Sequence, residues 1–218
     1  MEQMTGPADE QSITWVHTLI IGSGAAGLNA AVQLKQSGME DVMILTEGLQ
    51  AGTSINTGSD KQTYYKLSLC GNQADSPRAL AETLFAGGSV HGDIALVEAS
   101  LSTRAFMHLV GLGLPFPHDE WGQYVGYKTD HDPLQRATSI GPYTSREMCR
   151  ALINRVRELQ VAVREGRVVV RLLTTLEGGR LRCCGALAVA VNGNDDGRLE
   201  LYGAENVVLA VGGPGGLY

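Results

Sequence analysis

A glycine-rich turn between an apolar strand and a helix constrains this chain more than any other feature. Residues 13–21 form a continuous apolar run, typical of a parallel strand buried on both faces. A turn of pattern G-x-G-x-x-G follows at 22–27, and residues 25–38 are rich in helix formers and end at Gly38. With a second apolar run at 42–46, they make a strand–helix–strand unit of about 30 residues. This unit predicts a right-handed βαβ crossover.

The glycines of this turn have separate roles in a dinucleotide-binding site. Gly22 permits the tight turn, Gly24 lets backbone approach a pyrophosphate, and Gly27 lets the helix pack against the strand. The N–H groups of the first helical turn and the helix dipole both favour phosphate there. Without a ligand, the pattern would only be a glycine-rich strand–helix turn. We predict cofactor contact for the whole motif: Gly22, Ser23, Gly24, Ala25, Ala26 and Gly27.

An acidic residue about 20 positions further on usually binds a ribose hydroxyl of the dinucleotide. Thr46 stands 19 residues after Gly27, and Glu47 follows it. Either side chain is a candidate, the hydroxyl of Thr46 directly and the carboxylate of Glu47 in a slightly shifted register. Neither is basic, which argues against a 2′-phosphate and hence against NADP. The motif alone leaves FAD and NAD open.

Three helices are expected between this unit and the C-terminal third of the chain. The first begins at Pro77 after Asp75-Ser76, and the second covers 93–110 with an i, i+4 row at Val97, Leu101, Ala105 and Leu109. Residues 111–142 hold four of the seven prolines and predict an irregular surface excursion. Thr144 and Glu147 form a capping-box pattern at the start of the third helix.

From residue 161 the pattern changes to strands. We expect strands at 168–173, 181–191, 199–203 and 206–211, the last leading into the glycines at 212–216. The predicted fold class is therefore α/β: a Rossmann-like domain with a central parallel sheet, flanking helices and an added antiparallel β meander. Residues 13–218 are predicted to form one domain, and the polar residues 1–12 a flexible tail.

Composition excludes several functions. The net charge of −6 comes without a basic patch, so no nucleic-acid partner is expected. No apolar run approaches the roughly 20 residues of a membrane helix, so no membrane insertion is expected. The four cysteines lack metal-site spacing, and we predict free thiols, no metal and a cytoplasmic protein; a redox disulfide between Cys183 and Cys184 is the less favoured alternative.

Four blocks resemble the flavoprotein subunits of fumarate reductase and succinate dehydrogenase, a family that includes L-aspartate oxidase. They are LIIGSGAAGLNAAVQL (19–34), AGTSINTGSD (51–60), the helix ending in GLGLPF (111–116) and VVLAVGGPGGLY (207–218). The resemblance implies FAD, held noncovalently because Gly52 stands where the covalently flavinylated branch has histidine. It implies further cofactor contacts at Thr53, Ser54, Thr57, Gly58, Ala210, Gly212 and Gly213, and adenine contact by the backbone at Val168.

The resemblance also implies a function for the intact protein: hydride transfer to or from a small carboxylate, with an electron-donor protein as a possible partner. Family members continue past Tyr218 into a capping domain and later segments that hold the substrate-binding residues. The FAD domain is thus expected to be incomplete and inactive alone, and no catalytic residue is assigned. Arg136 and Arg146 are expected in ordinary ion pairs. Two alternatives are a non-catalytic dinucleotide-binding module or fragment, and an NAD-dependent dehydrogenase domain, which the 51–60 loop and glycine-rich ending disfavour.

Overall fold

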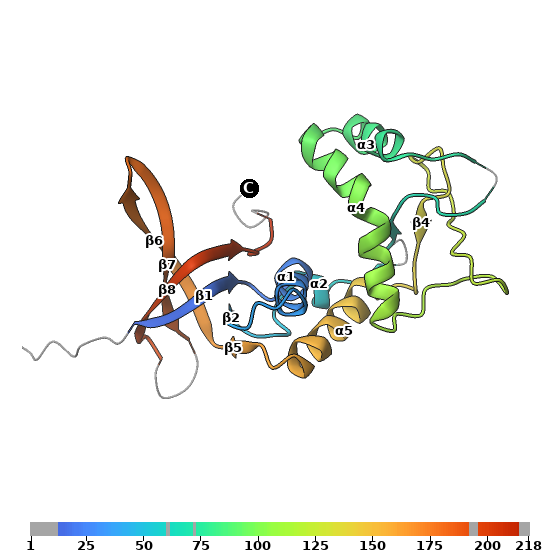
Figure 1. Cartoon of the computed structure of the whole chain (residues 1–218). Helices are drawn as coiled ribbons and strands as arrows, with labels where there is room; N and C mark the ends of the chain where they lie inside the picture. The colour runs from blue at the N-terminus through green and yellow to red at the C-terminus, as the bar shows by residue number, and fades with distance from the viewer. Residues whose placement is uncertain (1–12, 60–61, 72, 192–195, 214–218) are drawn as a thin grey trace, which may run out of the picture. The chain divides into compact units, whose positions relative to one another are not determined.

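The chain divides into two compact units (Figure 1). The computed structural model describes residues 13–59, 62–71, 73–191 and 196–213, so the tail predicted at 1–12 lies outside the described residues. The first unit comprises Met1–Thr53 and Leu152–Tyr218, and the second comprises Ser54–Ala151. Two helices, α2 (Thr53–Asn56) and α5 (Thr144–Glu158), run across the boundary between the units.

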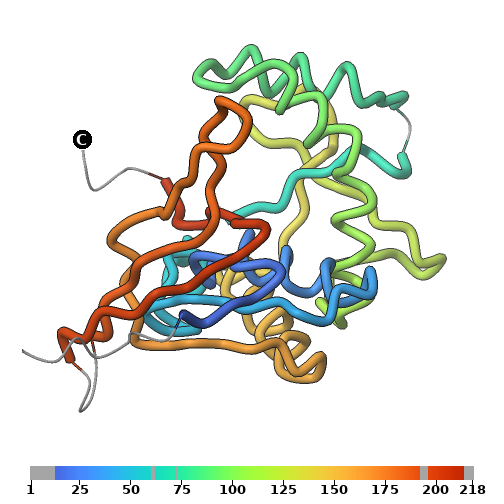
Figure 2. Tube along the Cα trace, turned by 60° about the vertical axis from the view of Figure 1, so that its left-hand side comes forward, coloured from blue at the N-terminus to red at the C-terminus, as the bar shows by residue number. Residues whose placement is uncertain are grey.

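A six-stranded sheet forms the first unit, in the order β5-β2-β1-β8-β7-β6. Strands β1, β2 and β5 are parallel, and β8 pairs with β1 in parallel and with β7 antiparallel. The red trace of β8 follows the blue trace of β1 (Figure 2). The bounds are Thr14–Ile21 for β1, Val42–Leu45 for β2, Ala162–Arg164 for β5, Arg167–Glu177 for β6, Arg180–Ala190 for β7 and Leu199–Leu209 for β8. This architecture confirms the predicted fold class.

The predicted strand–helix–strand unit is present at the start of this sheet. Strand β1 leads through the glycine turn into helix α1 (Ala25–Gln36), and β2 then pairs beside β1. All four residues of β2 are buried, as expected for a strand covered on both faces. Gly38 has φ +89°, so it ends α1 in the left-handed conformation that glycine adopts at low cost.

The antiparallel meander β6–β7–β8 differs from prediction in one respect. Residues 199–203 and 206–211 were expected as separate strands, but 199–209 form the single strand β8. Gly203, which suggested a break, lies within the strand under the ring of Trp15, where an added Cβ would stand 2.5 Å from the ring. A glycine inside a strand can mark such a close approach rather than an end. The strand therefore reaches from the meander directly to the glycine turn.

Helices α3 (Pro77–Ala86) and α4 (Gly92–Gly111) pack together in the second unit. Their contact is made by small residues and one leucine: Leu80, Ala81, Ala95 and Ala99. The row predicted on α4 is wrong as a buried face, because Val97 is 56% and Leu101 is 50% exposed. The buried row runs instead through Ala95, Ala99, Ser102, Phe106 and Leu109. Small residues occupy this face because they allow the close approach of α3.

An aromatic cluster fills the other end of α4. Phe106 and Phe116 are both buried, with ring centroids 4.8 Å apart, and Tyr64 and Tyr124 complete the cluster. Lys66 is fully buried beside it, with Nζ 5.0 Å from the centre of the Phe106 ring and donating to the Tyr124 carbonyl at 3.2 Å. Burial lowers the pKa of Lys66. The segment that contains Phe116 is irregular, as predicted, but it contributes to the core rather than only to the surface.

The capping box predicted for α5 is not formed. The Thr144 hydroxyl donates to the Gly141 carbonyl at 2.7 Å and accepts from the Ile140 N–H, so it faces back along the chain. The Ser145 N–H instead donates to Gln62 Oε1 at 2.9 Å. Glu147 forms an ion pair with Arg150 on the same helix. A side chain 83 residues away in sequence therefore satisfies a donor in the first turn of α5.

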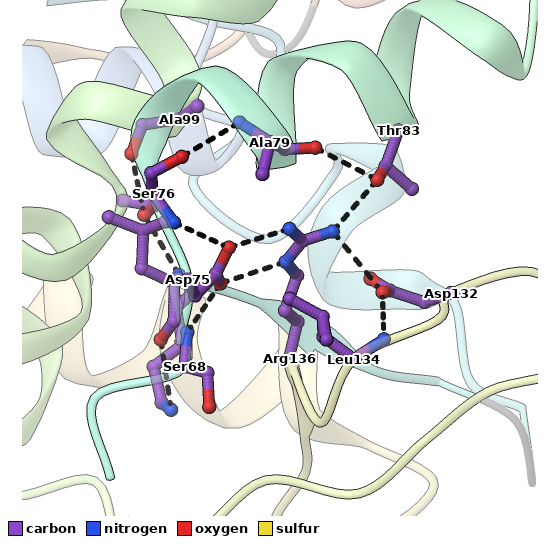
Figure 3. Close-up of polar contacts among 12 residues, drawn as sticks. Ser68, Asp75, Ser76, Ala79, Thr83, Ala99, Asp132, Leu134 and Arg136 are labelled. Carbon is purple, nitrogen blue, oxygen red and sulfur yellow. Dashed lines mark hydrogen bonds and ion pairs between the residues drawn. The ribbon is translucent and has the colours of Figure 1, made fainter. Parts of the chain in front are cut away.

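A buried ion-pair network ties the loops of the second unit to α3 (Figure 3). Arg136 donates to both carboxylate oxygens of Asp75, at 2.9 and 2.6 Å, and to Asp132 Oδ1 at 3.2 Å. It also donates to the hydroxyl of Thr83 on α3 at 2.9 Å. The side chains of Arg136 and Asp75 are each 1% exposed. The expectation of an ordinary ion pair for Arg136 is confirmed.

Candidate dinucleotide-binding site

The glycine turn is sterically tight at its first and last glycines. Gly22 has φ +103°, and an added Cβ would stand 2.4 Å from the carbonyl oxygen of Ala210. A Cβ at Gly27 would stand 2.0 Å from the carbonyl oxygen of Gly22. Both distances are far shorter than real Cβ contacts allow, so each position requires glycine. Gly24 is the N-cap of α1 and provides no side-chain cap, which leaves backbone facing the helix N-terminus.

A group of hydroxyls and one carbonyl closes the inner side of this turn. Ser23 Oγ lies 2.7 Å from Thr46 Oγ1, and both hydroxyls reach the carbonyl of Gly48, at 3.0 and 3.1 Å. The N–H of Gly48 donates back to Thr46 Oγ1 at 3.2 Å. Thr46 is therefore buried and joins the end of β2 to the turn. Glu47, the next residue, is exposed at this end of β2.

The corner between β5 and β6 wraps around the same end of β2. The N–H groups of Gly166 and Arg167 donate to the carbonyls of Glu47 and Thr46, at 3.1 and 3.0 Å. From the same corner, Glu165 Oε2 accepts the N–H of Leu49 at 2.8 Å. Val168 follows in β6, half-buried and opposite Val189 of β7. The corner thus brings the Val168 region beside Glu47, two positions that are far apart in sequence.

The end of β8 forms the other wall of the glycine turn. The N–H of Ala210 donates to the Ile21 carbonyl at 2.9 Å, which extends the β1–β8 pairing to the turn itself. The Ala210 side chain lies 3.3 Å from where a Cβ at Gly27 would be. Gly212 has φ +80°, and an added Cβ at Gly212 or Gly213 would meet no described atom within 4 Å. The chain therefore offers bare backbone beside the turn; the residues from Pro214 onward lie outside the described part.

The second predicted loop has contacts in both units. In the first unit, a Cβ at Gly52 would lie 3.3 Å from Gly24 Cα, so the loop passes close to the glycine turn just before Thr53. In the second unit, Gly58 packs against Tyr143, whose ring would be 2.7 Å from an added Cβ, and Thr57 Oγ1 lies 3.5 Å from Ser145 Oγ.

The thiol of Cys149 lies beside Ser54 in the second unit. Burial raises the pKa of Cys149 to about 11, against a smaller opposing effect of its hydrogen bond with Ser54. Cys149 is thus a buried neutral thiol at neutral pH rather than a nucleophile. The four cysteines are free, as predicted.

The structure brings most predicted cofactor residues together in the first unit. The residues assembled there are Gly22 to Gly27, Thr46, Glu47, Thr53, Val168, Ala210, Gly212 and Gly213, whereas Ser54, Thr57 and Gly58 belong to the second unit. Sequence reasoning missed Gly48, Gly52 and Glu165, which shape the turn. For Gly52 the signal was its place in a glycine- and threonine-rich loop; nothing in the pattern pointed to the side chain of Glu165.

The described residues contain neither a metal centre nor a membrane span. No group of three or more histidine, cysteine, aspartate or glutamate side chains among them could hold a metal ion. No helix within the described ranges is long and apolar enough to cross a membrane.

Comparisons with known proteins agree with this geometry. Residues 17–218 match the family described as FAD binding domain. L-aspartate oxidase of Streptomyces coelicolor is 29% identical over 204 residues, and that of Agrobacterium fabrum 32% over 206. Each alignment covers 92% of this chain but only 33% and 36% of the relative, so the chain spans about a third of the length of these proteins.

Solved structures show the same fold at low identity. A quinol fumarate reductase of E. coli superposes with a TM-score of 0.78 at 18% identity, covering 95% of this chain and 34% of that one. The Sdh1 complex of Mycobacterium smegmatis gives 0.79 at 21% identity, with 93% and 35% covered.

The residues present fit the cofactor that this family implies. A pyrophosphate needs bare backbone at a helix N-terminus, which Gly24 supplies, and room beside it, which the glycines at 22, 27 and 212 supply. A ribose needs an acceptor at the end of the second strand, where Glu47 is exposed. With residues 17–218 matched, this chain belongs to the FAD binding domain family.

Proposed function

We propose that this chain binds FAD noncovalently as part of a longer flavin-dependent oxidoreductase that acts on a small carboxylate. The observation that carries the proposal is the steric demand for glycine at 22 and 27, between the ends of β1 and β8. The names of two relatives, L-aspartate oxidase and the fumarate reductase (CoM/CoB) of Methanothermobacter marburgensis, support the substrate class because both refer to small dicarboxylates. The fumarate reductase chain is named as one of several subunits, which supports an electron-transfer partner protein.

Each part of the site has a defined task in this proposal. The N-terminus of α1 at Gly24 holds the pyrophosphate, and Glu47 accepts a hydrogen bond from a ribose hydroxyl. The backbone at Val168 contacts the adenine, and the bare backbone at Gly212 and Gly213 lets the cofactor approach. The other predicted contacts, at Thr53, Ser54, Thr57 and Gly58, serve the flavin end. When bound, the flavin supplies the hydride chemistry, and the protein supplies binding and orientation.

The proposal assigns no acid or base to this chain. Proton transfer in such a reaction needs a side chain close to the reacting carbon. We propose that this group and the substrate-binding residues belong to the longer protein, so that this chain binds cofactor without turnover.

A visible absorption spectrum tests the proposal most directly. The purified chain is saturated with FAD, desalted and measured for a retained flavin band. Acid precipitation should release all of the flavin into the supernatant, because the binding is noncovalent. Flavin that stays with the precipitate would contradict noncovalent binding, and retention of NAD in place of FAD would contradict the flavin assignment.

Two glycine variants provide a matched pair for this assay. Gly27→Ala places a Cβ 2.0 Å from the Gly22 carbonyl, so flavin retention should be lost. Gly111→Ala, at the end of α4, adds a Cβ that meets no described atom within 4 Å and should retain flavin normally. Circular dichroism shows whether each variant is folded. Equal flavin retention by folded Gly27→Ala would contradict the assigned role of the turn.

A further inference from the structure

A second pocket in the first unit uses none of the residues predicted to bind the dinucleotide. It is formed by the start of β1, the β5–β6 corner and the first residues of β8. Its lining consists of Thr14, Arg164, Arg167, Arg198, Leu199, Glu200, Leu201 and Tyr202. Thr14 begins β1, whereas the glycine turn follows Ile21, about 23 Å further along an extended strand. The β5–β6 corner, in contrast, adjoins the end of β2.

The centre of this pocket is rigid. Arg167 donates to both oxygens of Glu200, from Nε at 3.0 Å and from Nη2 at 2.8 Å. The hydroxyl of the buried residue Tyr202 donates to the same carboxylate, and Arg167 Nη1 donates to the Glu165 carbonyl at 3.0 Å. The hydrogen bond from Arg167 lowers the pKa of Glu200, so the carboxylate stays ionised. These bonds hold the Arg167 guanidinium in one orientation.

The lining carries an excess of positive charge. Three arginines stand against one glutamate, which leaves two positive charges, although the whole chain has a net charge of −6. Among the described residues, the guanidinium of Arg164 has no hydrogen-bond or ion-pair partner, and it is exposed. Guanidinium groups have the planar donor geometry that matches phosphate oxygens.

The size of the pocket limits what it can hold. Its volume is about 180 Å³, below the roughly 300–1,000 Å³ of sites that enclose drug-sized ligands. A whole nucleotide would not fit, but a single tetrahedral oxyanion would. We propose that the pocket binds one phosphate dianion, either free or as the end of a phosphate monoester, through Arg164 and Arg198 with Arg167 held behind them by Glu200.

Titration calorimetry with inorganic phosphate, in chloride buffer, tests the proposal. The double variant Arg164→Gln/Arg198→Gln should bind phosphate at least about tenfold more weakly, because two charged hydrogen-bond donors are lost. The control Arg180→Gln removes an exposed arginine on the β6–β7 turn, outside the pocket, and should bind as the unmodified chain does. Arg167 is left in place, since its removal would leave Glu200 unpaired.

Competition experiments separate the possible sources of the anion. Sulfate should displace phosphate, while AMP binds only if the pocket accepts a monoester through its terminal phosphate. Saturation with FAD should leave phosphate affinity unchanged, and the double variant should retain flavin normally. The proposal would be overturned by absence of phosphate binding, by equal losses in Arg180→Gln, or by loss of phosphate binding when FAD is present. That last outcome would place the pocket within the dinucleotide site.

Discussion

Removing the buried guanidinium of Arg136 should strongly destabilise the second unit. In Arg136→Met the side chain keeps most of its length, but four donated hydrogen bonds are lost, three to the carboxylates of Asp75 and Asp132 and one to Thr83. These carboxylate side chains are only 1% and 4% exposed, so water cannot replace the lost partner. Breaking a buried ion pair from one side costs about 3–5 kcal/mol. We expect a loss of that size in the free energy of unfolding.

The pH dependence of this loss gives an independent check. Burial alone would raise the pKa of Asp75, but hydrogen bonds from Arg136, Ser68 and Ser76 outweigh it, and the pKa of the folded state is lowered. A lowered pKa contributes stability above the unfolded value of about 3.9, and this stability is lost as pH falls through the folded pKa. Without Arg136 that contribution falls away, because burial opposes it. The difference between variant and unmodified chain should therefore narrow toward acid pH.

Hydrogen exchange in α3, combined with urea unfolding at pH 7 and at acid pH, measures both effects. Amides of α3 report on the second unit itself, because Thr83 and Ser76 connect this helix to the network. Arg78→Met is the matched control: it removes an arginine from the same helix, but one that forms only an exposed pair with Glu82. Unchanged stability of Arg136→Met, or an equal loss in Arg78→Met, would refute the reasoning.

Three further predictions concern other parts of the chain. Gly185→Ala should lower the free energy of unfolding by about 2 kcal/mol or more, because Gly185 has φ +151° and its Cβ would stand 2.0 Å from the Tyr202 carbonyl oxygen; urea titration measures this. Glu47→Gln should weaken FAD binding about tenfold by flavin fluorescence titration, as a charged acceptor is lost, while an unchanged affinity would remove Glu47 from the site. At pH 8 only about one Cys149 thiol in a thousand is ionised, given its pKa of about 11, so mass spectrometry should find it alkylated by iodoacetamide far more slowly than Cys70; equal rates would contradict its burial.

Much of the first unit could be predicted because its signals are local. The strand–helix–strand unit and the glycine turn need only an apolar run, helix formers and glycines at fixed positions. The steric reasons given for Gly22 and Gly27 correspond to contacts in the structure, at 2.4 and 2.0 Å from backbone oxygens. Gly38 likewise ends α1 with a positive φ. At these positions the sequence pattern and the backbone requirement coincide within a few residues.

Predictions failed where a distant part of the chain decided the outcome. The apolar row on α4 looked like a buried face, but α3 packs on the row of small residues instead. Thr144 and Glu147 match a capping box, yet Gln62 takes over the capping of α5. Gly203 looked like a strand end, but it accommodates the ring of Trp15 inside β8. In each case the local pattern allowed two structures, and a tertiary contact selected one.

The sequence by itself determined that this chain contains a βαβ unit with a phosphate-binding turn, because glycine sterics and hydrophobic burial act over a few neighbouring residues. Only the tertiary structure decided that Thr46 turns inward to Ser23, leaving Glu47 exposed as the acceptor at the end of β2. It also decided that Arg136 pairs with Asp75, 61 residues away, and that Arg167 pairs with Glu200, 33 residues away. Such pairs depend on how the sheet and loops bring distant residues together, and no local spacing encodes that geometry.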